Sequence, residues 1–144
     1  MIEILIAVFI LALLITVSAK TFTNFFSSSL LDQVVQGSIS SLEKAREDSI
    51  GGKNGFFYGV HFATTSITIF SGSAYSLGAN GNIVANLPSG VQVASTTLDG
   101  GGANVIFSPI SGETNNAGVV IFLNSRSNAT SAVRIYATGI SKKE

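Results

Sequence analysis

Glu3 is the first residue of this 144-residue chain whose side chain could do chemistry, because it is the only charge in a strongly apolar opening segment. Residues 4–19 carry no charge at all, and Lys20 ends the run. An ionised carboxylate in hydrocarbon or in a dry protein interface is unfavourable by several kcal/mol unless a cation compensates it. We therefore expect Glu3 either to pair with a cation of a neighbouring subunit or to mark a membrane surface. The first interpretation is the more specific one.

The remaining polar residues do not form a catalytic pattern. His61 is the only histidine, and its place in an alternating Tyr58 to Phe62 segment predicts a position on the wetter face of a strand. No serine lies in a Gly-x-Ser-x-Gly motif, and neither a phosphate-binding loop nor metal-ligand spacing is present. An enzyme is thus the least favoured class, with no cofactor and no metal expected.

Three short motifs have simple structural explanations. The run Gly100-Gly101-Gly102 resembles a phosphate cradle, but no hydrophobic strand precedes it and no helix follows, so a flexible turn is favoured. Asn128-Ala129-Thr130 satisfies the glycosylation sequon, which arises often by chance. Lys142-Lys143 is expected to be a solvated tail.

Composition excludes several classes of protein. Eight Lys and Arg balance eight Asp and Glu, so no broad positive surface exists and strong nucleic-acid binding is not expected. Cysteine is absent, so disulfides cannot stabilise the fold. Only 11% of residues are charged. A surface this poor in charge suits an extracellular β-domain or close assembly better than a free cytosolic enzyme.

The opening segment differs from a cleavable signal peptide, because such peptides place Lys or Arg before the apolar core and a small-residue cleavage site after it. We expect the chain to keep the segment. Its uncharged length is slightly short of the roughly 20 residues that usually cross a bilayer. A single membrane-spanning helix is consistent with it, with Lys20 reaching the interface.

Apolar residues continue at helical spacing after Lys20, which predicts one long helix over residues 2–49. Gly51-Gly52 is a good stop signal, since glycine adopts the left-handed conformation of a helix C-terminus. Residues 16–29 contain few strong helix formers and are the expected soft point. The stripe expected to pack on the rest of the chain consists of Ile39, Leu42, Ala45 and Ile50.

Beyond Gly55 the pattern changes to short branched and aromatic runs between turn residues. The expected strands are 57–62, 66–70, 83–87, 91–95, 104–108, 119–123 and 133–137. Their short connections predict a largely antiparallel sheet. The fold class is therefore α+β: a long N-terminal helix over residues 1–52, whose half 1–20 is apolar, packs against an antiparallel β-rich head over residues 53–144.

The run Ile2-Glu3-Ile4-Leu5-Ile6-Ala7-Val8 resembles the N-terminus of mature type IV pilins and type II secretion pseudopilins. In that family a prepilin peptidase cuts before the apolar segment, the new terminal residue is methylated, and a glutamate at the fifth position pairs with a neighbour's terminal amine. The resemblance gives Glu3 that role. Glu3 stands two positions earlier here, so we expect the chain to lack the first two mature residues. A helix-breaking proline, common near the position of Lys20, is missing.

The head is similar to the pseudopilin H and FimT-like group, whose heads are β-rich. The similar motifs are Ser41-Leu42-Glu43-Lys44-Ala45-Arg46, Gly59-Val60-His61-Phe62, Phe107-Ser108-Pro109-Ile110-Ser111-Gly112 and Arg134-Ile135-Tyr136-Ala137-Thr138-Gly139-Ile140. The resemblance implies the pilin fold, a bacterial source, residence in the inner membrane before assembly, and handling by pilus assembly machinery.

The first functional expectation is a structural subunit of a type IV pilus or pilus-like filament, displayed on the cell surface as a helical homo-oligomer. Its assembly residues would be Glu3, Ile4, Leu5, Ile6, Val8, Phe9, Leu11, Leu13 and Leu14. One alternative is a minor pseudopilin of a type II secretion or DNA-uptake system. Another is a monomeric, membrane-anchored domain that binds a surface ligand.

Overall fold

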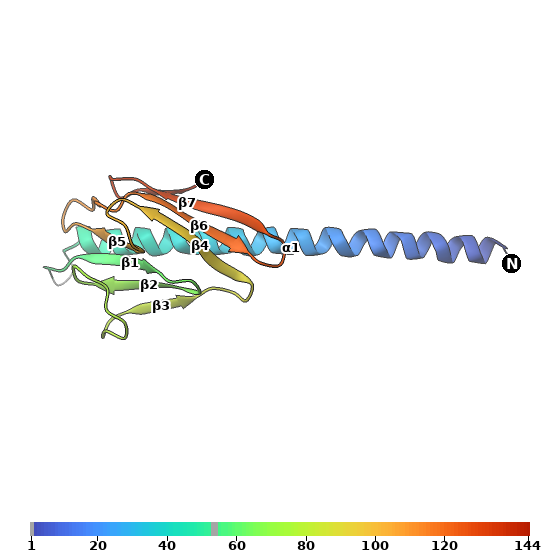
Figure 1. Cartoon of the computed structure of the whole chain (residues 1–144), viewed down its shortest axis with the longest axis horizontal. Coiled ribbons are helices and arrows are strands. Elements are labelled where there is room, and N and C mark those ends of the chain that lie inside the picture. Colours follow the sequence, from blue (N-terminus) through green and yellow to red (C-terminus); the bar gives the residue numbers. More distant parts are fainter. Residues whose placement is uncertain (1, 53–54) are drawn as a thin grey trace.

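A computed structural model describes residues 2–52 and 55–144 of the chain, and the side chains of residues 16–27 are not among the described ones. Helix α1 covers Ile2–Ile50 and forms a long rod (Figure 1). Its N-terminal part projects alone, while its C-terminal part packs against the β-rich head (Figure 1). Lys20, expected at a membrane interface, has a side chain outside the described set.

The helix ends where the glycine pair predicts. The Gly51 N–H donates to the Glu47 carbonyl at 2.8 Å, and Gly52 takes a φ of 58°, the left-handed conformation that glycine adopts at low cost. The expected soft stretch, residues 16–29, is helical throughout in this single chain. A change of that stretch within a filament stays a prediction.

In the part of the chain that the structure describes, eight strands follow the helix and form two sheets. The strands are β1 (Tyr58–Phe62), β2 (Ser66–Ser71), β3 (Ile83–Asn86), β4 (Val91–Leu98), β5 (Asn104–Phe107), β6 (Gly118–Asn124), β7 (Ala129–Ile135) and β8 (Ser141–Lys143). The first sheet has the order β3-β2-β1-β5 and the second β4-β6-β7-β8. Every strand pairing is antiparallel, so the described chain is an α+β protein with two antiparallel sheets.

All seven predicted strands are present, and two features differ from the prediction. Lys142-Lys143, expected to be a solvated tail, belongs to β8 and pairs with β7, because its backbone can complete a sheet without apolar side chains. The strands also divide into two sheets, since β1 pairs with β2 and β5 whereas β4 pairs with β6. Such long-range pairing leaves no periodic signal in the sequence.

The hydrophobic core lies where one face of α1 meets both sheets, since the residues of the opposite face, such as Gln36, Ser40 and Glu47, are exposed. Phe62 of β1 and Phe122 of β6 meet edge to face with ring centroids 6.4 Å apart, which joins the two inner faces. Leu42 and Ala45 of the helix are fully buried in the same cluster. The core therefore depends on the C-terminal half of α1 as much as on the strands.

Candidate assembly interface

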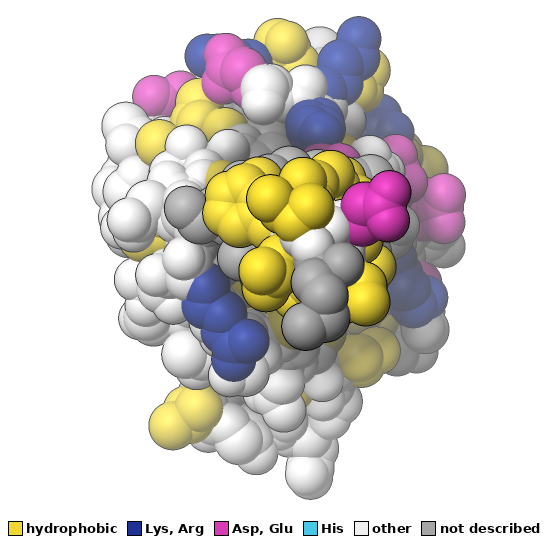
Figure 2. Space-filling model, turned by 90° about the vertical axis from the view of Figure 1, so that its right-hand side faces the viewer, with side chains coloured by type: hydrophobic (Ala, Val, Ile, Leu, Met, Phe, Trp, Pro, Cys, Tyr) yellow, Lys and Arg dark blue, Asp and Glu magenta, His cyan; other side chains and the backbone are white. Residues whose placement is uncertain are grey.

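The N-terminal turns of α1 expose apolar side chains on all sides. From Ile2 to Ile15 the large hydrophobic residues are between 51% and 72% exposed. Figure 2 looks onto the end of the molecule from which the helix projects, and hydrophobic side chains gather around that end with an acidic one at their edge. A contiguous apolar surface of this kind marks a site that another apolar phase or molecule covers.

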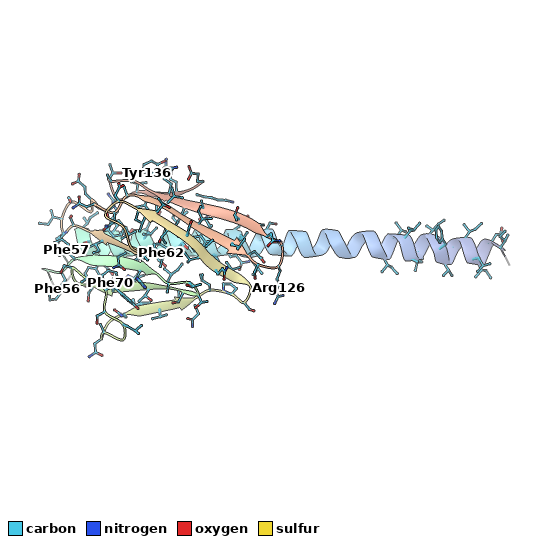
Figure 3. All side chains as sticks on the ribbon, in the orientation of Figure 1. Phe56, Phe57, Phe62, Phe70, Arg126 and Tyr136 are labelled. Atoms are coloured by element: carbon cyan, nitrogen blue, oxygen red, sulfur yellow. The ribbon has the colours of Figure 1, made fainter. Side chains whose placement is uncertain are left out.

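The predicted assembly residues belong to this exposed segment. Ile4, Leu5, Ile6, Val8, Phe9, Leu11, Leu13 and Leu14 all lie on it. Burying such a side chain from water stabilises by about 1.5–3 kcal/mol, so leaving all of these residues in contact with water is strongly unfavourable. No described part of the head covers any of them (Figure 3).

Glu3 lies in the first turn of α1, on the exposed segment. A negative charge is favourable there, because the first turn carries unsatisfied N–H groups and the positive end of the helix dipole. Those interactions are worth less than about 1 kcal/mol on an exposed helix and cannot compensate a buried carboxylate. Once this segment is covered, Glu3 therefore needs a cation or strong donors from a neighbouring molecule.

The residues predicted to pack the helix on the head lie in the C-terminal part of α1, away from the exposed segment. The structure buries Leu42 and Ala45 completely and packs Ile39 partly against the core. Ile50 departs from this pattern, since its side chain is 39% exposed at the end of the helix and lies over Gly112. A Cβ atom at Gly112 would come within 2.6 Å of the Ile50 Cδ1 atom, so Ile50 contacts a loop rather than the sheet face.

The candidate residues of other chemistries are held in structural roles. His61 is half-buried, stacks on Tyr75 with ring centroids 3.9 Å apart, and its Nδ1 lies 2.7 Å from the Asn104 Oδ1 atom. Gly100, Gly101 and Gly102 have φ values of 80°, 75° and 79°, as a tight turn requires. The described residues contain no group of three or more metal-ligating side chains.

Neither Asn128 of the glycosylation sequon nor the hollow beside β3 adds a candidate binding site. Asn128 is exposed in the turn between β6 and β7, with a φ of 54°. A mainly apolar hollow of about 250 Å³ lies between α1 and the end of β3 and is lined in part by Val34, Gly37 and Ala85. Its lining contains no charged residue, and its polar side chains are those of Gln33, Ser41 and Asn86.

Sequence reasoning missed two exposed features of the head. Phe56 and Phe57 lie at the end of the head farthest from the free helix, where both rings are exposed (Figure 3). Strand β3 is exposed along its whole length. The signal that could have indicated β3 is the absence of Asp, Glu, Lys and Arg from residues 54–98.

Over the side chains that the structure describes, no helix has an apolar stretch long enough to cross a membrane. Comparisons of the chain with protein-family models, with curated proteins and with solved structures find no match.

Proposed function

We propose that this protein is a structural subunit of a type IV pilus or pilus-like filament and has the pilin fold. The observation that carries the proposal is the division of α1 into two parts. Residues 2–15 expose large apolar side chains, whereas Leu31, Val34, Val35, Leu42 and Ala45 are buried in the head. A helix built in this way can bundle through its free half and display the head outside the bundle.

The free half suits contact with other helices better than contact with one groove, because its apolar residues occupy the whole circumference. Before assembly the same surface would be held in the inner membrane, as the resemblance to pilins implies. Lipid tails are as apolar as these side chains, so moving the helix from lipid into a bundle gains little hydrophobic energy. Assembly machinery, including a cytoplasmic ATPase in the pilin family, would supply the rest.

Glu3 gives this proposal its sharpest test. In a bundle the carboxylate is removed from water, and a terminal amine of a neighbouring subunit is the partner that the pilin resemblance implies. Breaking a buried ion pair by removing one partner typically costs about 3–5 kcal/mol. The Glu3→Ala change removes the carboxylate and leaves the amine without its partner, so assembly should fail.

The experiment is to image filaments sheared from cells that produce the native chain, Glu3→Ala or Glu47→Ala. Glu47 is an exposed residue of the head half of α1 and serves as the matched control. The proposal expects filaments made of this chain with Glu47→Ala and none with Glu3→Ala, while both variants accumulate in cells. Filaments of normal number and length with Glu3→Ala, or a native chain that extracts only as a monomer, would overturn it. A native chain found at one or few copies per filament would instead identify a minor pseudopilin.

A further inference from the structure

The two sheets present four edge strands, and three of them are protected by recognisable devices. The outer edge of β5 is covered by the following loop, where the Ile106 N–H donates to the Asn116 Oδ1 atom at 3.2 Å and the Ser108 N–H donates to the Glu113 carbonyl at 2.8 Å. Strand β4 has a bulge between Val93 and Ser95. Strand β8 is only three residues long and ends in Lys142 and Lys143. Coverage, bulges, short length and lysines are the usual means of preventing edge-to-edge pairing.

Strand β3 is also short, at four residues, but it has none of the other protections. It contains no charge, no proline and no recorded bulge, and it lies in the uncharged stretch of residues 54–98. Ile83 and Val84 are 54% and 57% exposed. No described segment pairs with its outer edge. By the physics of sheet edges, this strand is a template for another strand.

The register fixes which backbone groups point outward. The Leu87 N–H donates to the Thr65 carbonyl at 2.9 Å, and the same register pairs Ala85 with Ile67 and Ile83 with Ile69. Hydrogen-bonded and non-hydrogen-bonded pairs alternate along an antiparallel ladder. Ile83, Ala85 and Leu87 therefore direct their N–H and C=O groups toward β2. The corresponding groups of Val84 and Asn86 point away from the sheet.

We propose that β3 pairs with β3 of a second copy of this chain, antiparallel and centred on Val84. In this register the two Val84 residues exchange both of their backbone hydrogen bonds. Each Asn86 N–H reaches the partner's Asn82 carbonyl, while the Asn82 N–H keeps its bond to the Ala79 carbonyl at 3.2 Å. The contact joins two four-stranded sheets into one continuous sheet. Ile83 and the partner's Ala85 then face each other and lose exposed apolar surface.

A second copy is the occupant that the composition favours. A twofold contact places the residues closest to the axis near their own copies, so any charge there would meet a like charge. Residues 54–98 carry no charge, so strand β3 brings no like charges of its own to the axis, and the nearest carboxylate, Asp48 of the helix, lines a hollow beside Ile83. The side chains of β3 itself offer a charged peptide no complementary group.

The β3 contact differs from the contacts between neighbouring subunits inside the proposed filament. The strands of the first sheet run along α1 (Figure 1), and a twofold axis through Val84 reverses the strand direction, so the two long helices must point in opposite directions. Neighbours within one polar filament have the same direction. The β3 contact would therefore join heads of two filaments that run in opposite directions, or two unassembled chains.

Single cysteines test the contact directly, because the chain has none of its own. The two Val84 Cα atoms should be about 5.5 Å apart in this register, within the range of about 4.4–6.8 Å that a disulfide spans. In the full chain in mild detergent, Val84→Cys should form intermolecular disulfides roughly tenfold or more faster than Thr97→Cys, an exposed control on β4, because pairing holds the thiols at a high effective concentration. Equal rates for the two variants would overturn the proposal.

Charge supplies the second test. Val84→Lys places two ammonium groups beside each other across the axis, and its exposed position leaves the fold intact. Sedimentation of the full chain in detergent should show dimers for the native chain and for Thr97→Lys, and monomers for Val84→Lys with unchanged circular dichroism. The native dimer should persist at high salt. A native chain that stays monomeric, a Val84→Lys chain that dimerises, or a dimer that salt dissolves would each contradict β3 pairing.

Discussion

Ser49 and Phe107 join the end of the long helix to the first sheet through a buried hydrogen bond. The Ser49 Oγ atom donates to the Phe107 carbonyl at 2.8 Å and accepts a longer bond, 3.4 Å, from the Tyr58 N–H. One hydroxyl therefore serves β5 and β1 together, and Ser49 is fully buried. The helix is held in the head by polar as well as apolar contacts.

The first prediction follows from that hydroxyl. Ser49→Ala removes the hydroxyl that donates to the buried Phe107 carbonyl and accepts from the Tyr58 N–H, and loss of a buried hydrogen bond costs about 1–3 kcal/mol. The free energy of unfolding, measured by guanidinium denaturation, should fall by about that amount. Ser40→Ala changes an exposed serine of the same helix and should have almost no effect. Equal stabilities of the two variants would show that the Ser49 bonds contribute nothing.

The second prediction concerns Leu42, the largest fully buried side chain among those that the structure describes on the helix. Leu42→Ala should lower the free energy of unfolding by about 2–5 kcal/mol, and Leu42→Asp by more, because a carboxylate then lies in the core. Ser40→Asp places the same charge on the exposed side of the helix and is the control. If Leu42→Asp unfolds at the same denaturant concentration as Ser40→Asp, the helix does not contribute to the stability of the head.

Local patterns allowed the main elements to be predicted. Alternation of Val60 and Phe62 with Gly59 and His61 predicted the faces of β1, and the structure buries the first pair in the core. The glycine pair after Ile50 predicted the helix end. Each of these signals acts through neighbours in the sequence, since backbone conformation and side-chain alternation are local properties.

The features that could not be predicted depend on distant residues. Strand β8 forms because β7 offers it a free edge, and its Ser-Lys-Lys sequence has no strand pattern. Ile50 was expected in the core, but the loop that carries Gly112 covers only part of it. The exposed β3 edge exists because the order of strands places β3 at the end of its sheet. None of these relations can be recognised from the local sequence of a single segment.

The third prediction concerns the C-terminal end of the chain. The Lys143 Nζ atom lies 2.6 Å from the Asp32 Oδ1 atom, which links β8 to the helix, but both side chains are about half exposed. Exposed ion pairs contribute about 0–1 kcal/mol and weaken with salt. Asp32→Asn should therefore change the denaturation midpoint only slightly at low salt and not at all in 1 M NaCl. A large loss that salt does not reduce would mean that Asp32 stabilises the head through another interaction.

The last prediction compares two glycines for which the same substitution should have opposite effects. Gly59 lies beneath the Phe70 ring: a Cβ atom there would come within 2.6 Å of both the Phe70 Cζ atom and the Val105 carbonyl oxygen. Phe70 is almost fully buried and lies edge to face against Tyr75, with ring centroids 5.6 Å apart, so the ring has little room to move. Gly59→Ala should therefore separate β1 from β5 or displace Phe70.

Gly37 is the matched control because it lies within α1 and a Cβ atom there would meet nothing within 4 Å beyond the adjacent helix backbone. Alanine in an open helical position is more favourable than glycine by about 0.5–1 kcal/mol, since it loses less backbone entropy on folding. Thermal unfolding should show a lower midpoint for Gly59→Ala and a slightly higher one for Gly37→Ala. A Gly59→Ala chain as stable as the native one would mean that Phe70 does not need the space that glycine leaves.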